Sequence, residues 1–143
     1  MATAPRLLWQ SSCGTDITTT PVALATAIAK YDFISVESNL AVLMDAVTED
    51  ATFGGLSNDV HVASDANQKL TIVLLMKCVA TVDCTSDTYI LGAPVMYTSA
   101  NAVVDATSGT TLGWTHKYSG STAVTRLDVL FDVPLLQKLF ALT

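Results

Sequence analysis

Two stretches of this chain resemble each other, and their shared pattern limits the folds that the chain can adopt. The stretches are residues 33–54 and 94–113. Each reads as a strand, a turn containing Ser and Asn, a short apolar strand, an Asp-Ala pair, a polar turn and then Phe-Gly or Leu-Gly. One-residue slips are needed to align them. A strand-and-turn pattern that occurs twice predicts an all-β protein built from two related β units.

An apolar strand follows each copy, beginning near Leu70 in the first and near Arg126 in the second. Residues 127–133 alternate between apolar and polar, except that the apolar Leu130 falls on the polar side. A two-stranded ribbon is only marginally stable by itself. We therefore expect the two units to close on one core, as a small β-barrel or sandwich over residues 29–133.

Residues 1–28 differ in character from the two units. They contain two prolines, a run of Thr and only two charged residues, and no helical apolar stripe crosses their first part. This pattern predicts an extended N-terminal arm that becomes ordered only against another surface. Trp carries much of the binding energy of protein interfaces. The candidate partner-binding residues of the arm are Arg6, Leu7, Leu8 and Trp9, and the alternative is that Trp9 folds back onto its own domain.

Residues 134–143 form an apolar C-terminal tail. Pro134 stands where a helix can begin, because proline is favoured in the first turn. The residues after it are apolar on almost all sides, and so short a helix is unstable alone. The tail must therefore pack on its own domain or on a neighbour. Leu136 and Phe140 are its candidate partner-binding residues.

The composition points to a covered surface. Half of the residues are hydrophobic and 14% are charged, whereas an ordinary soluble domain has roughly 25% charged residues. So few charges cannot cover a whole surface, and we expect a partner to cover part of it. A Thr- and Ser-rich surface that stays soluble without charge is the alternative. The net charge of −6 and the scattered basic residues disfavour nucleic acid and anionic membranes as partners.

No arrangement of residues along the chain indicates catalysis. His61 and His116 stand alone, without the spacing of metal ligands, so we expect no metal and no cofactor. The three cysteines have no disulfide-framework spacing, which favours a reducing compartment. The N-terminus does not read as a signal peptide, and the apolar run near residues 70–76 is too short to span a membrane. We expect synthesis in the cytoplasm and no enzymatic activity.

Residues 29–133 resemble the capsid decoration, or cement, proteins of tailed bacteriophages. In that family a strand begins with a phrase like Gly-x-Pro-Val-x-Tyr, and residues 91–97 read Leu-Gly-Ala-Pro-Val-Met-Tyr. A Val-containing strand at 101–106, the Leu-Gly-Trp at 112–114 and a Ser/Gly-rich turn before a final alternating strand complete the likeness. Residues 30–34 resemble the same opening phrase in a first copy, with Tyr31 where such proteins often have Gly.

The resemblance implies a function as well as a fold. It implies a small β protein that assembles as a homotrimer and binds the major capsid protein lattice on the outer surface of the virion, near three-fold axes. It also implies an N-terminal arm that reaches across or under neighbouring capsid subunits. The alternatives are another virion subunit, such as a fibre, spike or tail component, and a small carbohydrate-binding β module. The latter needs aromatic side chains on one face, and the available ones are Tyr89, Tyr97, Trp114 and Tyr118.

Overall fold

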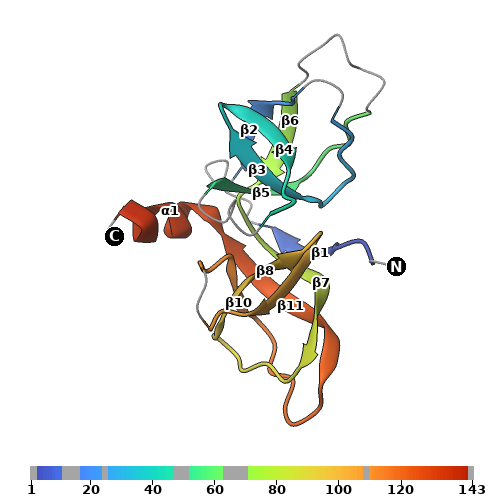
Figure 1. Ribbon diagram of the computed structural model, residues 1–143, viewed down its shortest axis with the longest axis vertical. Helices are drawn as coiled ribbons and strands as arrows, with labels where there is room; N and C mark the ends of the chain where they lie inside the picture. The colour runs from blue at the N-terminus through green and yellow to red at the C-terminus, as the bar shows by residue number, and fades with distance from the viewer. Residues whose placement is uncertain are drawn as a thin grey trace.

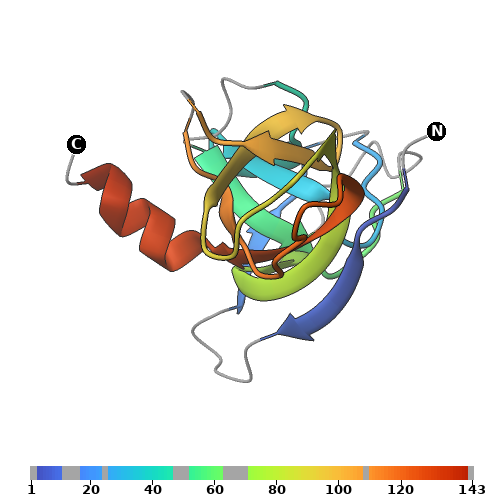
Figure 2. The same ribbon diagram turned by 90° about the horizontal axis from the view of Figure 1, so that it is seen from below.

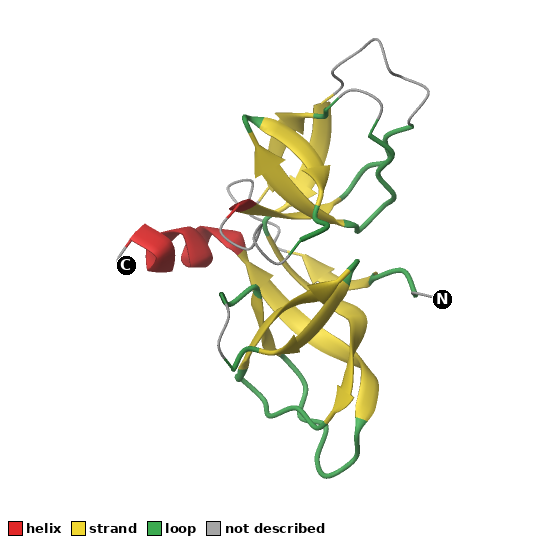
Figure 3. Ribbon diagram, in the orientation of Figure 1, coloured by secondary structure: helices red, strands yellow, loops and turns green. Residues whose placement is uncertain are grey.

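The computed structural model confirms a mostly β protein with one short C-terminal helix (Figures 1 and 3). It describes residues 3–10, 17–23, 26–46, 52–62, 71–107 and 110–141. The elements are β1 (Arg6–Gln10), β2 (Ile17–Pro21), β3 (Phe33–Glu37), β4 (Leu40–Leu43), β5 (Phe53–Ser57), β6 (Thr71–Leu75), β7 (Lys77–Asp87), β8 (Pro94–Ser99), β9 (Ala102–Asp105), β10 (Gly113–Thr115), β11 (Val124–Asp132) and α1 (Val133–Ala141).

The second half of the chain closes into a five-stranded barrel, here called the barrel. Its strands are hydrogen-bonded in the order β7-β11-β10-β8-β9. A parallel pairing of Asp83 with Ala102 and of Cys84 with Val103 joins β9 back to β7 and completes the closure. Strand β1, from the other end of the chain, adds to the free edge of β7 in antiparallel fashion.

The first half forms a five-stranded sheet, here called the curled sheet, with the order β2-β6-β5-β3-β4. A single parallel bridge between Val22, just after β2, and Ala41 of β4 brings its two edges together. In Figure 1 the curled sheet and the barrel form two lobes, one above the other. Each lobe thus has the same order of pairing, with β2 to β6 in the places of β7 to β11.

The strand registers show that the internal repeat is structural. Leu75 of β6 pairs with Leu56 of β5, which pairs with Phe33 of β3. In the barrel, Leu130 of β11 pairs with Trp114, which pairs with Pro94 of β8. The two related units that the sequence predicts are therefore present. Each unit also includes the strand that precedes it in the chain, β2 or β7. Each unit closes on itself and does not form one sheet with the other unit.

Two β-bulges interrupt the correspondence between the two units. In β5 the register shifts at Gly54, and in β8 it shifts at Thr98. An extra residue in one strand leaves the neighbouring pairs aligned, because the bulge absorbs it locally. The turns beyond remain equivalent, and both contain an Asn with positive φ, 64° at Asn39 and 55° at Asn101.

The main hydrophobic core fills the barrel and continues into the junction between the lobes. Phe33 and Phe53 of the curled sheet pack edge-on or tilted against Phe131 of the barrel, with ring centroids 5.4 and 5.8 Å away. Asn101, in the β8–β9 turn, accepts a hydrogen bond from the Phe33 N–H and donates one to Asp32, both at 2.8 Å. A smaller cluster lies inside the curled sheet. The expectation of one core thus holds at the junction and fails within the curled sheet.

The predicted N-terminal arm over residues 1–28 is wrong for its described part. β1 pairs with β7 and β2 pairs with β6, and Val22 and Ile28 are fully buried in the smaller cluster. The β domain therefore begins well before residue 29. The physical reason is that β-branched Thr and Ile favour strands, and pairing satisfies their backbone groups. Low charge and missing helical periodicity suit an added strand as well as a free arm.

α1 begins directly after β11. Its first-turn N–H groups are satisfied in turn: Val133 donates to the Met76 carbonyl at 2.8 Å, Pro134 has none, and Leu135 donates to the Asp132 carboxylate at 3.2 Å. In Figures 1 and 2 the helix projects from the side of the molecule away from the N-terminus. Among the described residues, no helix has the length and apolar character needed to cross a membrane.

Candidate interaction site

A β-bulge in β1 turns two neighbouring apolar side chains outward. Leu7 pairs with Ala80 and Trp9 with Val79, so Leu8 is the extra residue between them. Leu7 packs against the main core. Leu8 remains 44% exposed and Trp9 49% exposed. A regular strand would alternate their directions, so it is the bulge that places Leu8 and Trp9 at the same surface.

Leu8 and Trp9 line a groove of about 650 Å³ on the outside of the barrel. The groove crosses β1, β7 and β11 and reaches the residue after β10. Its lining residues are Leu8, Trp9, Lys77, Val79, His116, Asp128 and Leu130. This is the surface that we call the apolar groove.

The floor of the apolar groove is a row of side chains on directly paired residues. Trp9 pairs with Val79 and Val79 with Leu130, and these three residues line the groove. Beyond the groove, Leu130 pairs with Trp114. Directly opposed residues in antiparallel strands point to the same face of a sheet. Leu130, the exception in the alternating pattern, therefore belongs to a continuous apolar strip on the outer face of the barrel.

Polar groups stand beside this strip. Lys77, His116 and Asp128 line the groove, and the Asp128 carboxylate accepts a hydrogen bond of 2.6 Å from the Thr81 hydroxyl. An apolar floor with aromatic and aliphatic anchors and a few polar groups at its margin is the usual make-up of a protein-binding surface. The groove can bury an apolar side chain or a short segment of a partner and orient it by hydrogen bonds.

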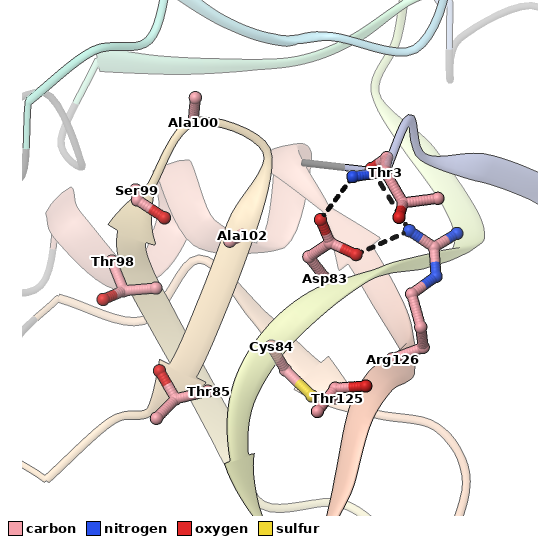
Figure 4. A pocket seen from close by; sticks show the side chains of 10 residues that line it. All are labelled: Thr3, Asp83, Cys84, Thr85, Thr98, Ser99, Ala100, Ala102, Thr125 and Arg126. Atoms are coloured by element: carbon pink, nitrogen blue, oxygen red, sulfur yellow. Dashed lines mark hydrogen bonds and ion pairs between the residues drawn. The ribbon is translucent and has the colours of Figure 1, made fainter. Parts of the chain in front are cut away.

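A second feature ties the N-terminal segment to the barrel, and sequence reasoning missed it (Figure 4). Arg126 of β11 forms an ion pair of 2.8 Å with Asp83 of β7 and donates hydrogen bonds to the carbonyls of Thr3 and Ala4, both at 3.2 Å. The Thr3 N–H donates to the other Asp83 oxygen at 2.7 Å. We call these contacts the latch. Because they join residues far apart in the chain, no local pattern could have revealed them.

The latch affects the acidity of Asp83. Burial acts to raise the pKa of this carboxyl, but the hydrogen bonds from Arg126 and Thr3 and the positive charge of Arg126 outweigh it. The pKa of Asp83 is therefore lowered below its ordinary value. Asp83 stays ionised, which keeps the latch closed at neutral pH.

The other predicted binding residues fall in different places. Arg6 is exposed on β1 opposite Thr81. Leu136 is only 2% exposed and belongs to the main core, so the prediction that it binds a partner is wrong. The helix turns it inward, and the exposed side of α1 carries Leu135 and Leu139 instead. The side chain of Phe140 lies outside the described residues.

Two potentially reactive side chains, those of Cys78 and His61, are buried in the fold. No group of three or more potential metal ligands comes together among them. Burial raises the pKa of the Cys78 thiol to about 12, so it stays protonated and unreactive. The Nδ1 atom of His61 contacts the carbonyl of Thr26 within the fold. Neither Cys78 nor His61 lines the apolar groove.

The aromatic residues considered for carbohydrate binding do not gather on one face. Tyr89 and Tyr97 are buried in the main core. The Tyr89 hydroxyl donates to the Thr85 carbonyl at 2.7 Å, and the Tyr97 hydroxyl donates to the Met44 carbonyl at 3.4 Å. Tyr118 is exposed and Trp114 is half-buried. Two of the four side chains are therefore unavailable for stacking on a sugar.

No protein-family model matches the chain, and neither does any curated protein. The site must therefore be interpreted from its own geometry. That geometry consists of the apolar groove at the edge of the barrel and the latch that holds the N-terminal segment beside it.

Proposed function

We propose that this protein is a structural subunit of a tailed-bacteriophage virion, a decoration protein that binds the outer surface of the capsid and stabilises the shell. The apolar groove carries the proposal. Leu8 and Trp9, half exposed at its margin, are the anchors that would enter the capsid surface. The resemblance of residues 29–133 to decoration proteins supports the same conclusion.

A decoration protein binds by spreading modest contacts over a lattice. In the proposed homotrimer, three copies of the apolar groove would contact three capsid subunits, and their combined attachment would far exceed that of one. The low content of charged residues, 14%, fits a surface that is covered in the assembled particle. The proposed location is accordingly the outer capsid surface of a virion assembled in the host cytoplasm.

The groove is equally suited to another virion subunit, in a fibre, spike or tail. Electron microscopy of particles would separate these possibilities, because it locates the protein directly. A carbohydrate-binding module has less support, since Tyr89 and Tyr97 are in the core and cannot present a stacking face. Binding of a glycan array by a monomeric form would favour that module instead.

Matched substitutions test the apolar groove. Leu8→Ala and Trp9→Ala should each weaken co-sedimentation with capsids that lack this protein by about tenfold or more, the loss typical of an interface anchor. Leu91→Ala and Tyr118→Ala make similar changes at exposed positions that do not line the groove. These controls should bind as the wild type does.

Both groove variants should keep their stability within about 1 kcal/mol, because the replaced side chains are half exposed. Retained capsid binding by Trp9→Ala and Leu8→Ala would contradict the role of the groove. A wild-type chain that does not sediment with capsids would contradict the proposed function as a whole.

A further inference from the structure

The two lobes differ at the outer edge of their first strand, β7 in the barrel and β2 in the curled sheet. In the barrel, β7 has β11 on one side and β1 on the other. In the curled sheet, β2 takes the place of β7 and pairs with β6. On its other side β4 approaches only at the bridge Val22–Ala41, and no described strand pairs with residues Ile17 to Thr19. Ile17 of β2 is equivalent to Val79 of β7, because their partners Leu75 and Leu130 are equivalent.

Burial at the equivalent positions follows the presence of β1. Val79, which β1 covers, is 5% exposed, whereas Ile17 is 37% exposed. Ala80 is in the main core, and its counterpart Thr18 is exposed. The edge of β2 thus retains apolar surface at the place where β7 has an added strand.

The backbone of β2 offers hydrogen-bonding groups at this edge. Val73, the residue opposite Thr19, donates its N–H to Asp59 and accepts at its carbonyl from Asn58. The pair Thr19–Val73 therefore exchanges no hydrogen bonds. Since backbone groups alternate in direction along a strand, those of Thr19 and Ile17 face away from β6, towards the open edge.

A pocket of about 390 Å³ lies beside the same edge. Thr18 lines it together with Val36 and Leu74. On the barrel, the residue of β1 opposite Ala80 is Leu7, whose side chain packs against the core. A strand added to β2 in the same register would place its corresponding residue opposite Thr18, at the pocket.

We infer that the edge of β2 accepts an extended strand from another protein, in the way that β7 accepts β1. The expected donor carries a large aliphatic residue opposite Thr18, as β1 carries Leu7. Each chain has two acceptor edges and one β1, which its own β7 holds, so exchange of β1 between copies would leave an edge uncovered. Because β1 is not free to cover β2, we assign the donor, resting on the proposed function, to the capsid lattice subunit.

Strand acceptance is tested with a synthetic peptide of residues 4–10, which contains β1. Added to the full chain, it should slow hydrogen exchange at the amides of Ile17 and Thr19 by about tenfold or more, since these N–H groups would become hydrogen-bonded. Leu7→Ala in the peptide should weaken binding. Protection confined to β1 or β7, or no binding at all, would overturn the inference.

Two variants of the chain control this test. Thr19→Pro removes the outward N–H while leaving the bonds to β6, because proline is tolerated on an edge strand. Thr19→Val keeps the N–H at similar volume. The peptide should protect Ile17 in Thr19→Val and not in Thr19→Pro. Both variants are also examined without peptide. If Thr19→Val then self-associates and Thr19→Pro does not, the edge of β2 binds a second copy of this chain, and the inference is overturned.

The donor is tested by sedimentation with capsids. Thr19→Pro should bind decoration-free capsids at least tenfold more weakly than Thr19→Val. Equal binding by the two would overturn the assignment of the donor to the lattice subunit. If the wild-type chain does not bind capsids, the proposed function fails, and the peptide experiment still decides whether β2 accepts a strand.

Discussion

Arg126 shows how one residue can hold two distant parts of the chain together. Its guanidinium reaches Asp83, the carbonyls of Thr3 and Ala4, and the Thr81 carbonyl at 3.3 Å. A planar group with five N–H donors can satisfy several acceptors at once, which a lysine cannot do. The latch therefore positions the chain just before β1, and with it the anchors of the apolar groove.

Acidification should loosen the latch. Because the pKa of Asp83 is lower in the folded chain, its contribution to stability is complete above the ordinary aspartate pKa of about 4 and is lost as pH falls through the folded value. The Thr3 amide resonance should therefore shift in NMR spectra only below about pH 4. Asp83→Asn should abolish that titration.

The cost of Asp83→Asn at neutral pH should stay below about 1 kcal/mol, since the ion pair is partly exposed to solvent. Arg126→Lys is the matched control, because it keeps the positive charge and loses the planar guanidinium that bonds several acceptors at once. A Thr3 resonance that titrates equally in wild type and Asp83→Asn would show that the latch does not depend on this carboxylate.

At the scale of elements, one glycine in each unit allows two strands to approach closely. A Cβ on Gly113 would lie 2.7 Å from the Leu130 carbonyl oxygen, and one on Gly55 would collide with the Leu75 carbonyl. Leu130 and Leu75 occupy equivalent positions in the two registers. The sequence pattern aligns Gly113 with Gly54, whereas Gly55 is its structural equivalent, because Gly54 is the extra residue of the bulge.

Gly113→Ala should destabilise the fold by about 1–3 kcal/mol, the usual cost of forcing extra volume into a packed site. The obstacle is a backbone oxygen of β11, which cannot move without disturbing the β10–β11 pairing. Urea denaturation measures the change as a lower midpoint with an unchanged slope. A change below about 0.5 kcal/mol would mean that the strands separate easily at this point.

At the scale of the whole molecule, the junction joins the two lobes through buried contacts. Phe33 packs against Phe131, and its N–H donates to Asn101 in the barrel. The Tyr97 hydroxyl of the barrel donates to Met44 beside the curled sheet. Because the main core includes residues of both lobes, we expect them to unfold together.

Phe33→Ala should lower the free energy of unfolding by about 3–5 kcal/mol, as expected for removing a buried phenyl ring. Hydrogen exchange should accelerate by the same factor in β6 and in β7, which lie in different lobes. Phe33→Leu, which keeps most of the volume, should cost less. Faster exchange in β6 alone would show that the lobes unfold independently.

The candidate site was only partly visible in the sequence. Trp9 was identified because a tryptophan without a local partner is conspicuous, and the structure leaves it half exposed at the groove. Leu136 was misassigned because a short apolar tail does not reveal which of its sides faces inward. The contributions of Val79, Asp128 and the latch depend on strand pairing, which joins residues separated by dozens of positions.

The sequence by itself determined the all-β class, the two related units and the start of the C-terminal helix near Pro134, because alternation, turn residues and proline act locally. Only the tertiary structure decided that each unit closes with the strand before it, and that β1 covers β7 while no described strand covers the edge of β2 from Ile17 to Thr19. Pairing is decided by contacts between distant segments. The Thr-rich β2 and the apolar β1 could each have paired elsewhere. Backbone pairing with β6 and β7, together with the packing of Leu7 on the main core and the burial of Thr20, selects the observed partners.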